Sequence, residues 1–306
     1  MKMTMMDKEM KHIIKFLLII CVSAFGTQSV LAQCFGKVYH QRLDDLTWEN
    51  EYCAYRAYGP ALQQHGERAY GYDIWVKNTH DTIVDLRYRL HFPPKGSGIK
   101  RKSFHEDWGN GMDKYDVGPS LGCCTAALLD KHDSIVFPWC WQQCEILDAG
   151  PEKFKVHLTY KPTLLPSGKS YTEHRLISCQ RGQRFNRCEV WYEGLDEPRK
   201  IAVGIVVHPA NTDTLRMDKK HHYIAYVDLQ NQQQVKKDGS DGVIYIGAYC
   251  PQATEYRQSQ NHLLAVSTLK PGKHYVYWFG ATWSKLDVHS FPAWCKLMER
   301  IGKSHK

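Results

Sequence analysis

Apolar and polar residues alternate with a period of two through most of this chain. Such alternation is typical of β-strands with one buried face, and it recurs at residues 70–76, 153–160, 201–208, 243–249 and 274–279. Turn-forming residues separate these segments, as at 148–151 and 270–272. The sequence shows no regular alternation of strands and helices and no G-x-G-x-x-G motif. It therefore predicts an all-β fold, and a large antiparallel β-sandwich is the natural packing for so many strands.

A different periodicity appears only near the C-terminus. After Pro292, the apolar residues Trp294, Leu297, Met298 and Ile301 follow the i, i+3, i+4, i+7 spacing of one helix face. Proline is well tolerated in the first turn of a helix. We expect a short amphipathic C-terminal helix whose apolar side chains belong to the core.

The first 32 residues resemble a secretory signal peptide. Lys11 and Lys15 flank an apolar run that extends to Phe25, and Ala32 supplies a small residue at the cleavage position. The run is shorter than the roughly 20 apolar residues that span a membrane. We predict cleavage after Ala32 and a single domain over residues 33–306, exported to the periplasm or the extracellular space, with no transmembrane segment.

A lipid anchor is the alternative at this end of the chain. Cys34 lies close to the predicted cleavage site, but Gln33 precedes it. Lipid attachment requires a small residue at that position, so we favour a product without a lipid anchor.

Ten of the eleven cysteines follow the predicted signal peptide. In an exported chain an even number suggests disulfides. Cys179 and Cys188 lie symmetrically about a predicted turn at 181–184, so a hairpin would place them opposite each other. The alternative is that several cysteines are small buried residues with free thiols.

The charge balance narrows the possible partners. The formal net charge is +8, but Lys and Arg are scattered among acidic residues without a basic block. Nucleic acid is therefore not an expected partner. A mild basic excess is compatible with an acidic substrate such as a uronate.

The segment 103–128 concentrates chemically active side chains among several glycines. Long loops of this composition are common places for function. Its candidate residues are His105, Glu106, Asp107, Trp108, Asp113, Lys114 and Tyr115. The structural alternative is a set of solvated charges and turn caps around a half-buried Tyr115.

Six ordered motifs resemble those of the domain-of-unknown-function family 4861. They lie at residues 48–50, 55–62, 72–77, 103–128, 145–151 and 283–285. The resemblance implies a secreted β-sandwich related in shape to galactose mutarotases and to sandwich domains of some polysaccharide lyases. It also implies a setting of pectin-like or other uronate-containing glycans in Gram-negative bacteria. One departure is Cys124, where glycine is expected.

The leading hypothesis for function is a lyase that acts on uronate-containing oligosaccharides. Elimination needs a base, an acid and a group that neutralises the carboxylate. The residues assigned to these catalytic roles are His105, Lys114, Tyr115, His174 and Arg175. A mutarotase or epimerase using His105, His174 or His208, a glycoside hydrolase using paired carboxylates, and a non-catalytic glycan-binding module remain alternatives.

The remaining candidates are substrate-binding residues. Indole rings bind the apolar faces of sugars, and polar side chains fix their orientation. This set comprises Glu106, Asp107, Trp108, Asp113, His208, Trp278, Trp283 and Lys285. No cofactor and no metal is predicted, although His105, Glu106, Asp107 and Asp113 could offer ligands to a divalent ion such as calcium. The expected partner is an oligosaccharide or polysaccharide.

Overall fold

The computed structural model describes residues 33–165, 168–208, 214–229 and 241–304. The predicted signal peptide and its cleavage after Ala32 lie outside these residues. Residues Ala32–Lys306 form one compact unit.

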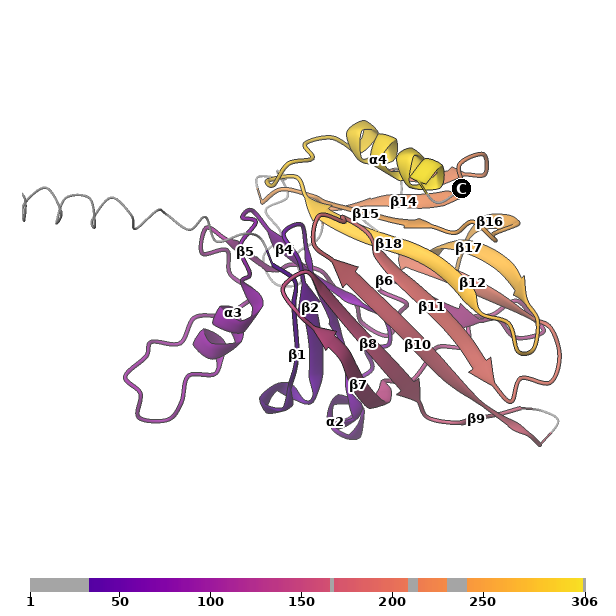
Figure 1. Ribbon diagram of the computed structural model, residues 1–306, viewed down its shortest axis with the longest axis horizontal. Helices are drawn as coiled ribbons and strands as arrows, with labels where there is room; N and C mark the ends of the chain where they lie inside the picture. Colours follow the sequence, from indigo (N-terminus) through magenta and orange to yellow (C-terminus); the bar gives the residue numbers. More distant parts are fainter. Residues whose placement is uncertain (1–32, 166–167, 209–213, 230–240, 305–306) are drawn as a thin grey trace, which may run out of the picture. The chain divides into compact units, whose positions relative to one another are not determined.

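Three antiparallel sheets make up this unit (Figure 1). The first has five strands in chain order: β1 (Phe35–Tyr39), β2 (Asp45–Glu49), β3 (Ala54–Ala57), β4 (Asp73–Lys77) and β5 (Gly111–Asp113). A short 3₁₀ turn, η1 (His40–Arg42), joins β1 to β2.

The largest sheet has nine strands, eight of them in the order β13-β14-β15-β18-β11-β10-β8-β7, with β9 paired to β10. Their bounds are β7 (Trp141–Ala149), β8 (Lys153–Tyr160), β9 (Thr163–Leu164), β10 (Ser170–Gln180), β11 (Asn186–Glu193), β13 (Leu215–Asp218), β14 (Tyr223–Asp228), β15 (Ile244–Tyr249) and β18 (Tyr275–Trp283).

A four-stranded sheet completes the fold in the order β16-β17-β12-β6. It comprises β6 (Cys123–Leu128), β12 (Arg199–Val206), β16 (Glu255–Ser259) and β17 (His262–Leu269). A parallel bridge between Tyr72 and Gly122 links this sheet to the five-stranded one.

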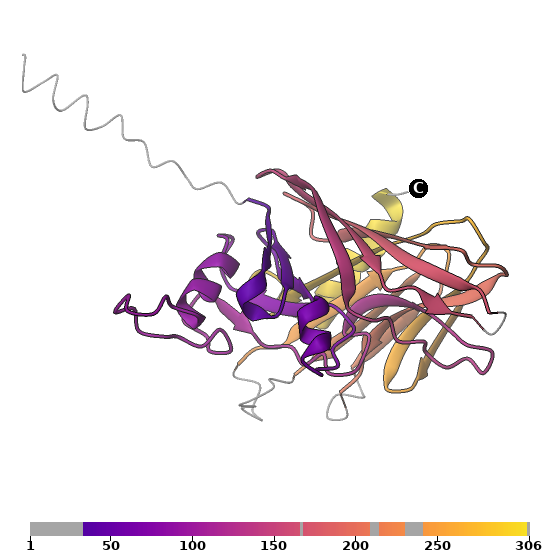
Figure 2. The same ribbon diagram turned by 90° about the horizontal axis from the view of Figure 1, so that it is seen from below.

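The two smaller sheets pack on one face of the largest sheet (Figure 2). β6 lies against β15 and β18, β4 lies against β18, and β1 lies against β8. Buried side chains from all three sheets form one apolar cluster. The fold is therefore the antiparallel β-sandwich that the alternating pattern predicted, and each of the five predicted strand segments contains or overlaps a strand.

The predicted C-terminal helix is α4 (Phe291–Ser304), which packs on the opposite face of β14 and β15 (Figure 1). Its apolar stripe buries Trp294 and Met298 completely, and the Trp294 indole donates a hydrogen bond to the Ile246 carbonyl at 3.1 Å. Gly247 makes this approach possible, since a Cβ there would lie 2.7 Å from the Met298 sulfur.

Two helices have no clear sequence signal: α2 (Pro60–Gln64) and α3 (Val84–His91). The start of α3 is fixed by the buried Glu49 carboxylate, which accepts hydrogen bonds from the Ile83 and Val84 amides. Lys77 balances its charge at 3.0 Å. Residues 78–110 thus form an excursion between two paired residues, Lys77 and Gly111.

The predicted disulfide between Cys179 and Cys188 is wrong. Both thiols are free, as are those of the other described cysteines. The register of β10 and β11 places Ile177, rather than Cys179, opposite Cys188. Cys179 is buried next to Cys34, whose Sγ lies 3.6 Å from the Cys179 carbonyl oxygen.

The backbone conformation at Cys124 explains why glycine is expected at this position. Its φ angle is +60°, in the left-handed region that favours glycine. The chain therefore places a buried thiol in a conformation that costs about 1–2 kcal/mol for a residue with a side chain.

Candidate functional site

The loop singled out by composition is largely buried. Asp113 lies at the end of β5, where its carboxylate is 3.0 Å from the guanidinium of Arg56. Asp45 and Asp73 bind the same guanidinium at 3.4 and 2.5 Å. Burial raises the pKa of Asp73 to about 8, and the negative charge of Asp113 adds to this shift. The cluster is an internal charge network rather than a surface for substrate.

Lys114 and Tyr115 are also enclosed, with exposures of 1% and 0%. Burial lowers the pKa of the Lys114 ammonium and raises that of the Tyr115 hydroxyl. The Tyr115 ring stands edge-on to His208, with ring centres 5.7 Å apart. Tyr115, predicted as a catalytic residue of the loop with a half-buried aromatic as the alternative, is a fully buried core residue.

His208 has a partner at each ring nitrogen. Nδ1 lies 2.7 Å from the buried Asp228 carboxylate, and Nε2 lies 3.0 Å from the Asp116 carbonyl. Burial opposes protonation, but the hydrogen bond to Asp228, the charges of Asp228 and Asp116 and the bond to the Asp116 carbonyl together outweigh it and raise the pKa of His208. Such an imidazole holds two elements together and has no free nitrogen for a sugar.

The rest of this segment caps turns and packs. The Asp107 carboxylate accepts hydrogen bonds from the amides of Gly109 and Gly111 at 2.9 and 3.4 Å. It also lies 3.6 Å from the Lys285 ammonium. Trp108 lies under the Arg87 guanidinium at 4.2 Å.

Three more predicted residues, Trp283, Glu106 and His105, differ in their exposure. Trp283 is completely buried and donates to the Asp241 carbonyl. Glu106 is exposed on the surface. His105 is half-buried, with Nδ1 3.5 Å from the Asp113 carboxylate, and burial lowers its pKa, as does the charge of Arg56.

Arg175 and His174 are neighbours on β10 and point to opposite faces of the largest sheet. Arg175 is fully buried, where its guanidinium binds Glu173, the Tyr72 hydroxyl and the Ala126 carbonyl. Its predicted role in neutralising a substrate carboxylate would require a surface position that it does not have. His174 faces away from the core.

The face that carries His174 is a continuous surface across β8, β10, β11 and β18. Every second residue of each strand points outward, and the strand registers align these residues in rows. We call this the outer face. It carries Lys153, Lys155, His157 and Thr159 from β8, Thr172, His174, Leu176, Ser178 and Gln180 from β10, Arg187, Glu189, Trp191 and Glu193 from β11, and Val276 and Trp278 from β18.

Four parallel rings form a ladder in the middle of the outer face. The Trp191 ring stacks with His174 on one side at 5.0 Å and with His274 on the other at 4.7 Å, each at an interplanar angle of 6°. His157 also stacks with Trp191, at 5.3 Å. The ladder encloses His174, whose Nε2 is buried, whereas 26% of the His157 side chain is exposed.

Two of these imidazoles share a hydrogen bond. His157 Nε2 lies 3.1 Å from His174 Nδ1. At the two ends, Glu145 approaches His157 at 3.9 Å and Glu193 approaches His174 at 3.5 Å. Burial lowers the pKa of His174, the charge of His157 lowers it further, and Glu193 opposes both. The lowered pKa of His174 favours its neutral form near neutral pH.

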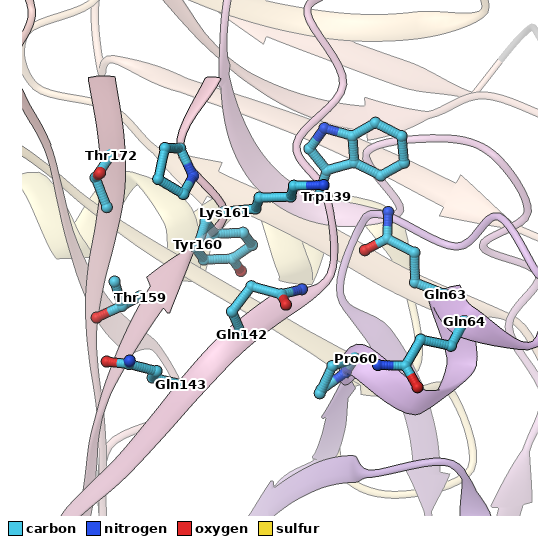
Figure 3. A pocket seen from close by; sticks show the side chains of 11 residues that line it. Pro60, Gln63, Gln64, Trp139, Gln142, Gln143, Thr159, Tyr160, Lys161 and Thr172 are labelled. Atoms are coloured by element: carbon cyan, nitrogen blue, oxygen red, sulfur yellow. The ribbon is translucent and has the colours of Figure 1, made fainter. Parts of the chain in front are cut away.

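A pocket of about 750 Å³ adjoins this pair (Figure 3). Gln63 and Gln64 of α2 lie on one side of the view, and Thr159 and Thr172 of the outer face lie on the other. The remaining lining residues are Pro60, Trp139, Gln142, Gln143, Tyr160, Lys161 and Pro162. Thr159 connects the pocket to the ladder, since its hydroxyl lies 3.4 Å from His174 Nδ1.

Side-chain amides and hydroxyls dominate this lining, and Trp139 is 47% exposed at its rim. Amides and hydroxyls both donate and accept hydrogen bonds, as a sugar does, and an exposed indole offers an apolar face. The pocket therefore offers hydrogen-bond donors, hydrogen-bond acceptors and one apolar ring face to a ligand.

Sequence reasoning named His174 and Trp278 but not their neighbours His157, Trp191, His274 and Trp139. His157 occupies an outward position of the predicted strand 153–160, and Trp191 occupies an outward position of β11, which the sequence analysis did not predict. Only the register shows that they meet.

One group of metal-ligating types converges among the described residues. Asp218, His221 and Glu299 have ligand atoms within 4.8 Å of one another. Two of the residues suggested as ligands for a divalent ion in the loop already have other partners. Arg56 binds Asp113, and backbone amides donate hydrogen bonds to Asp107. In the part of the chain that the structure describes, no helix is long and apolar enough to cross a membrane.

Comparison with known proteins places this chain in a family without an assigned activity. It is similar to "Uncharacterized protein P7" of Formosa agariphila, with 29% identity over 201 residues. The match covers 63% of this chain and 48% of the relative, so the chain spans about half the length of that protein. The profile of the family described as "Domain of unknown function (DUF4861)" matches residues 24–305, and the chain therefore belongs to this family, as its motifs indicated.

Proposed function

We propose that the protein binds uronate-containing oligosaccharides across the outer face and cleaves them by β-elimination, with His157 and His174 as the acid–base pair. The observation that carries the proposal is the 3.1 Å contact between the two imidazoles beside a pocket of sugar-binding character. An exported protein would meet such glycans outside the cytoplasm. The burial of Cys34 favours a product without a lipid anchor at that residue.

The reaction needs a base for the proton on the carbon next to the carboxylate. The lowered pKa of His174 favours its neutral form near neutral pH, as an acceptor of protons requires. Because His174 Nε2 is buried, the proton enters through the partly exposed His157, whose Nε2 is hydrogen-bonded to His174 Nδ1. The same pair then returns it to the leaving oxygen as the carbon–oxygen bond breaks and the carbon–carbon double bond forms.

The developing negative charge on the uronate needs a cation. Lys161 supplies it, because it lines the same pocket as Thr159 and Thr172 and is exposed. In this proposal it replaces Arg175, which is buried.

Glutamine and threonine side chains of the pocket would hold the sugar hydroxyls. Trp139 would cover one apolar face of the ring. This arrangement places the sugar next to Thr159, whose hydroxyl contacts His174.

The test is incubation with polygalacturonate, glucuronan and rhamnogalacturonan fragments, read by the ultraviolet absorbance of unsaturated uronates. We expect new absorbance with at least one of these glycans, and its loss in His174→Gln while calorimetric binding persists. New reducing ends without new absorbance would reject elimination in favour of hydrolysis.

A non-catalytic glycan-binding module is the second candidate, because exposed Trp139 and the amide lining suffice for binding alone. It predicts binding without any product. Trp139→Ala would then abolish binding, whereas His174→Gln would leave it unchanged.

A further inference from the structure

A second pocket, of about 790 Å³, opens on the outer face at the end far from the amide-lined one. It lies where β8, β10, β11 and β18 meet α4. Gln180 and Trp278 belong to its lining, whereas Thr172 lines the first pocket. With roughly 3.3 Å per strand residue, Thr172 and Gln180 are separated by about 26 Å along β10.

This pocket is basic. Lys153, Arg184, Arg187 and Arg300 line it, and none of the described lining residues is acidic. The carboxylates that pair with three of these cations stand outside the lining: Asp148 with Lys153, Asp287 with Arg184, and Glu189 with Arg187.

Apolar rings lie among these cations. Trp278 and Phe185 line the pocket, and Trp278 packs at a tilt on Tyr249 with ring centres 5.7 Å apart. A cavity that combines an indole with guanidinium groups suits a ring that has one apolar face and a carboxylate or sulfate group.

The two pockets are joined by the ladder. Glu189 makes the connection, since His274 Nδ1 lies 2.6 Å from one of its oxygens and Arg187 lies 2.7 Å from the other. The outward rows run without interruption from Thr172 through His174 and Leu176 to Ser178.

We infer that the basic pocket is a remote subsite for an anionic sugar unit, so that the preferred ligand is a linear acidic oligosaccharide of several units laid along β10. The inference rests on the proposed function for the identity of the ligand as a glycan. It adds that affinity grows with chain length and depends on the negative charges of units far from the imidazole pair.

The test uses calorimetric binding of acidic oligogalacturonides of increasing length to the full chain carrying His174→Gln, so that turnover does not interfere. The test variant is Lys153→Gln with Arg300→Gln. A matched control, Lys131→Gln with Lys270→Gln, removes two exposed charges elsewhere on the surface. Thermal unfolding checks that both variants are folded.

We expect the test variant to weaken binding of a hexamer about tenfold and to leave binding of a dimer and the control unchanged. Carboxyl-reduced hexamer should bind like the dimer. Equal hexamer affinity in the His174→Gln parent and in the test variant, or equal affinity of the parent for the hexamer and the carboxyl-reduced hexamer, would overturn the subsite.

The two proposals fail separately. Length-dependent binding without any unsaturated product would leave the subsite standing and remove the lyase. Elimination that is independent of chain length would do the reverse. Sulfated oligomers of equal length distinguish recognition of charge from recognition of carboxylate geometry.

Discussion

The segment 103–128 gathers candidate residues that are close in the sequence, whereas the outer face of the largest sheet gathers residues that are far apart in the sequence. The segment gathers ionisable residues within a short stretch of chain, yet Asp113, Lys114 and Tyr115 are buried. The outer face draws single residues from four strands, and its His157, His174 and Trp191 come into contact. A high density of ionisable residues along the chain therefore does not show that they are exposed, whereas contacts on the face of a sheet depend on the strand register.

The sharpest test of this contrast is activity. His174→Gln and His157→Gln should each lower the rate of elimination by about 10²–10⁴, the usual contribution of general acid–base catalysis. His105→Gln, the matched change in the buried segment, should leave the rate within about twofold, since general acid–base catalysis contributes at least about 10². Initial rates of unsaturated-product formation measure all three. A large loss of rate in His105→Gln, with unchanged rates in the other two variants, would place the active site in the segment 103–128 instead of on the outer face.

The second test is stability. Arg56→Met leaves the buried carboxylates of Asp45, Asp73 and Asp113 without their cation. We expect a loss of about 3–5 kcal/mol in the free energy of unfolding, measured by chemical denaturation. Arg187→Met, which breaks an outward pair with Glu189, should cost about 1 kcal/mol or less. Similar losses would show that the outer face is as structural as the cluster.

The third test uses the raised pKa of Asp73, about 8. An aspartate in the unfolded chain has a pKa near 3.9, so between these values the folded state holds a proton that the unfolded state has lost. Stability therefore falls as pH rises through this window. Between pH 6.5 and 8 we expect Asp73→Asn to show a shallower decline than the wild type. His208 contributes the same sign in both proteins, so the difference reports Asp73 together with Asp113, whose charge contributes to the shift.

A fourth test addresses the pH dependence of activity. Because the pKa of His174 is lowered, the rate should stay high until the pH is below that of an ordinary histidine, near 6.5. Glu193 is the group that opposes this shift. Glu193→Gln should therefore move the acidic limb of the profile to lower pH, without moving the unfolding midpoint. An acidic limb at the same pH in Glu193→Gln and wild type would show that the titration of His174 does not control the rate.

The smallest expected effect concerns the two adjacent cysteines of β6. Cys124→Gly removes a buried thiol but relieves a left-handed conformation, whereas Cys123→Gly only removes a thiol. We expect Cys123→Gly to be more destabilising by about 1 kcal/mol. Equal losses in thermal unfolding would show that Cys124 stores no strain.

The fold was more predictable than the site, for a physical reason. Alternation is a local property, so residues 153–160 alone indicate β8, and the spacing of Trp294, Met298 and Ile301 alone indicates α4. The start of α3 depends instead on Glu49, a residue 34 positions away from the first amide that it binds, Ile83. No local pattern contains that contact.

The candidate site shows the same limit. Neighbouring residues of a strand point to opposite faces of its sheet, so alternation alone could have assigned His174 and Arg175 of β10 to opposite faces. The distance between His157 and His174 depends on the pairing of β8 with β10. One residue of slip would have turned one of these rings into the core.

The excursion at residues 78–110 enters and leaves the five-stranded sheet at Lys77 and Gly111, which face each other as antiparallel partners. Its two ends are thus as close as the ends of a hairpin, so the register of β4 and β5 does not depend on its length. Part of its interior nevertheless belongs to the core, because Val84, Tyr88 and Phe104 are buried against Trp75, and the Tyr88 hydroxyl donates a hydrogen bond to Asp45. Insertion or deletion is therefore compatible with the same sandwich in the exposed stretch 94–102, and replacement of the whole excursion would open the core.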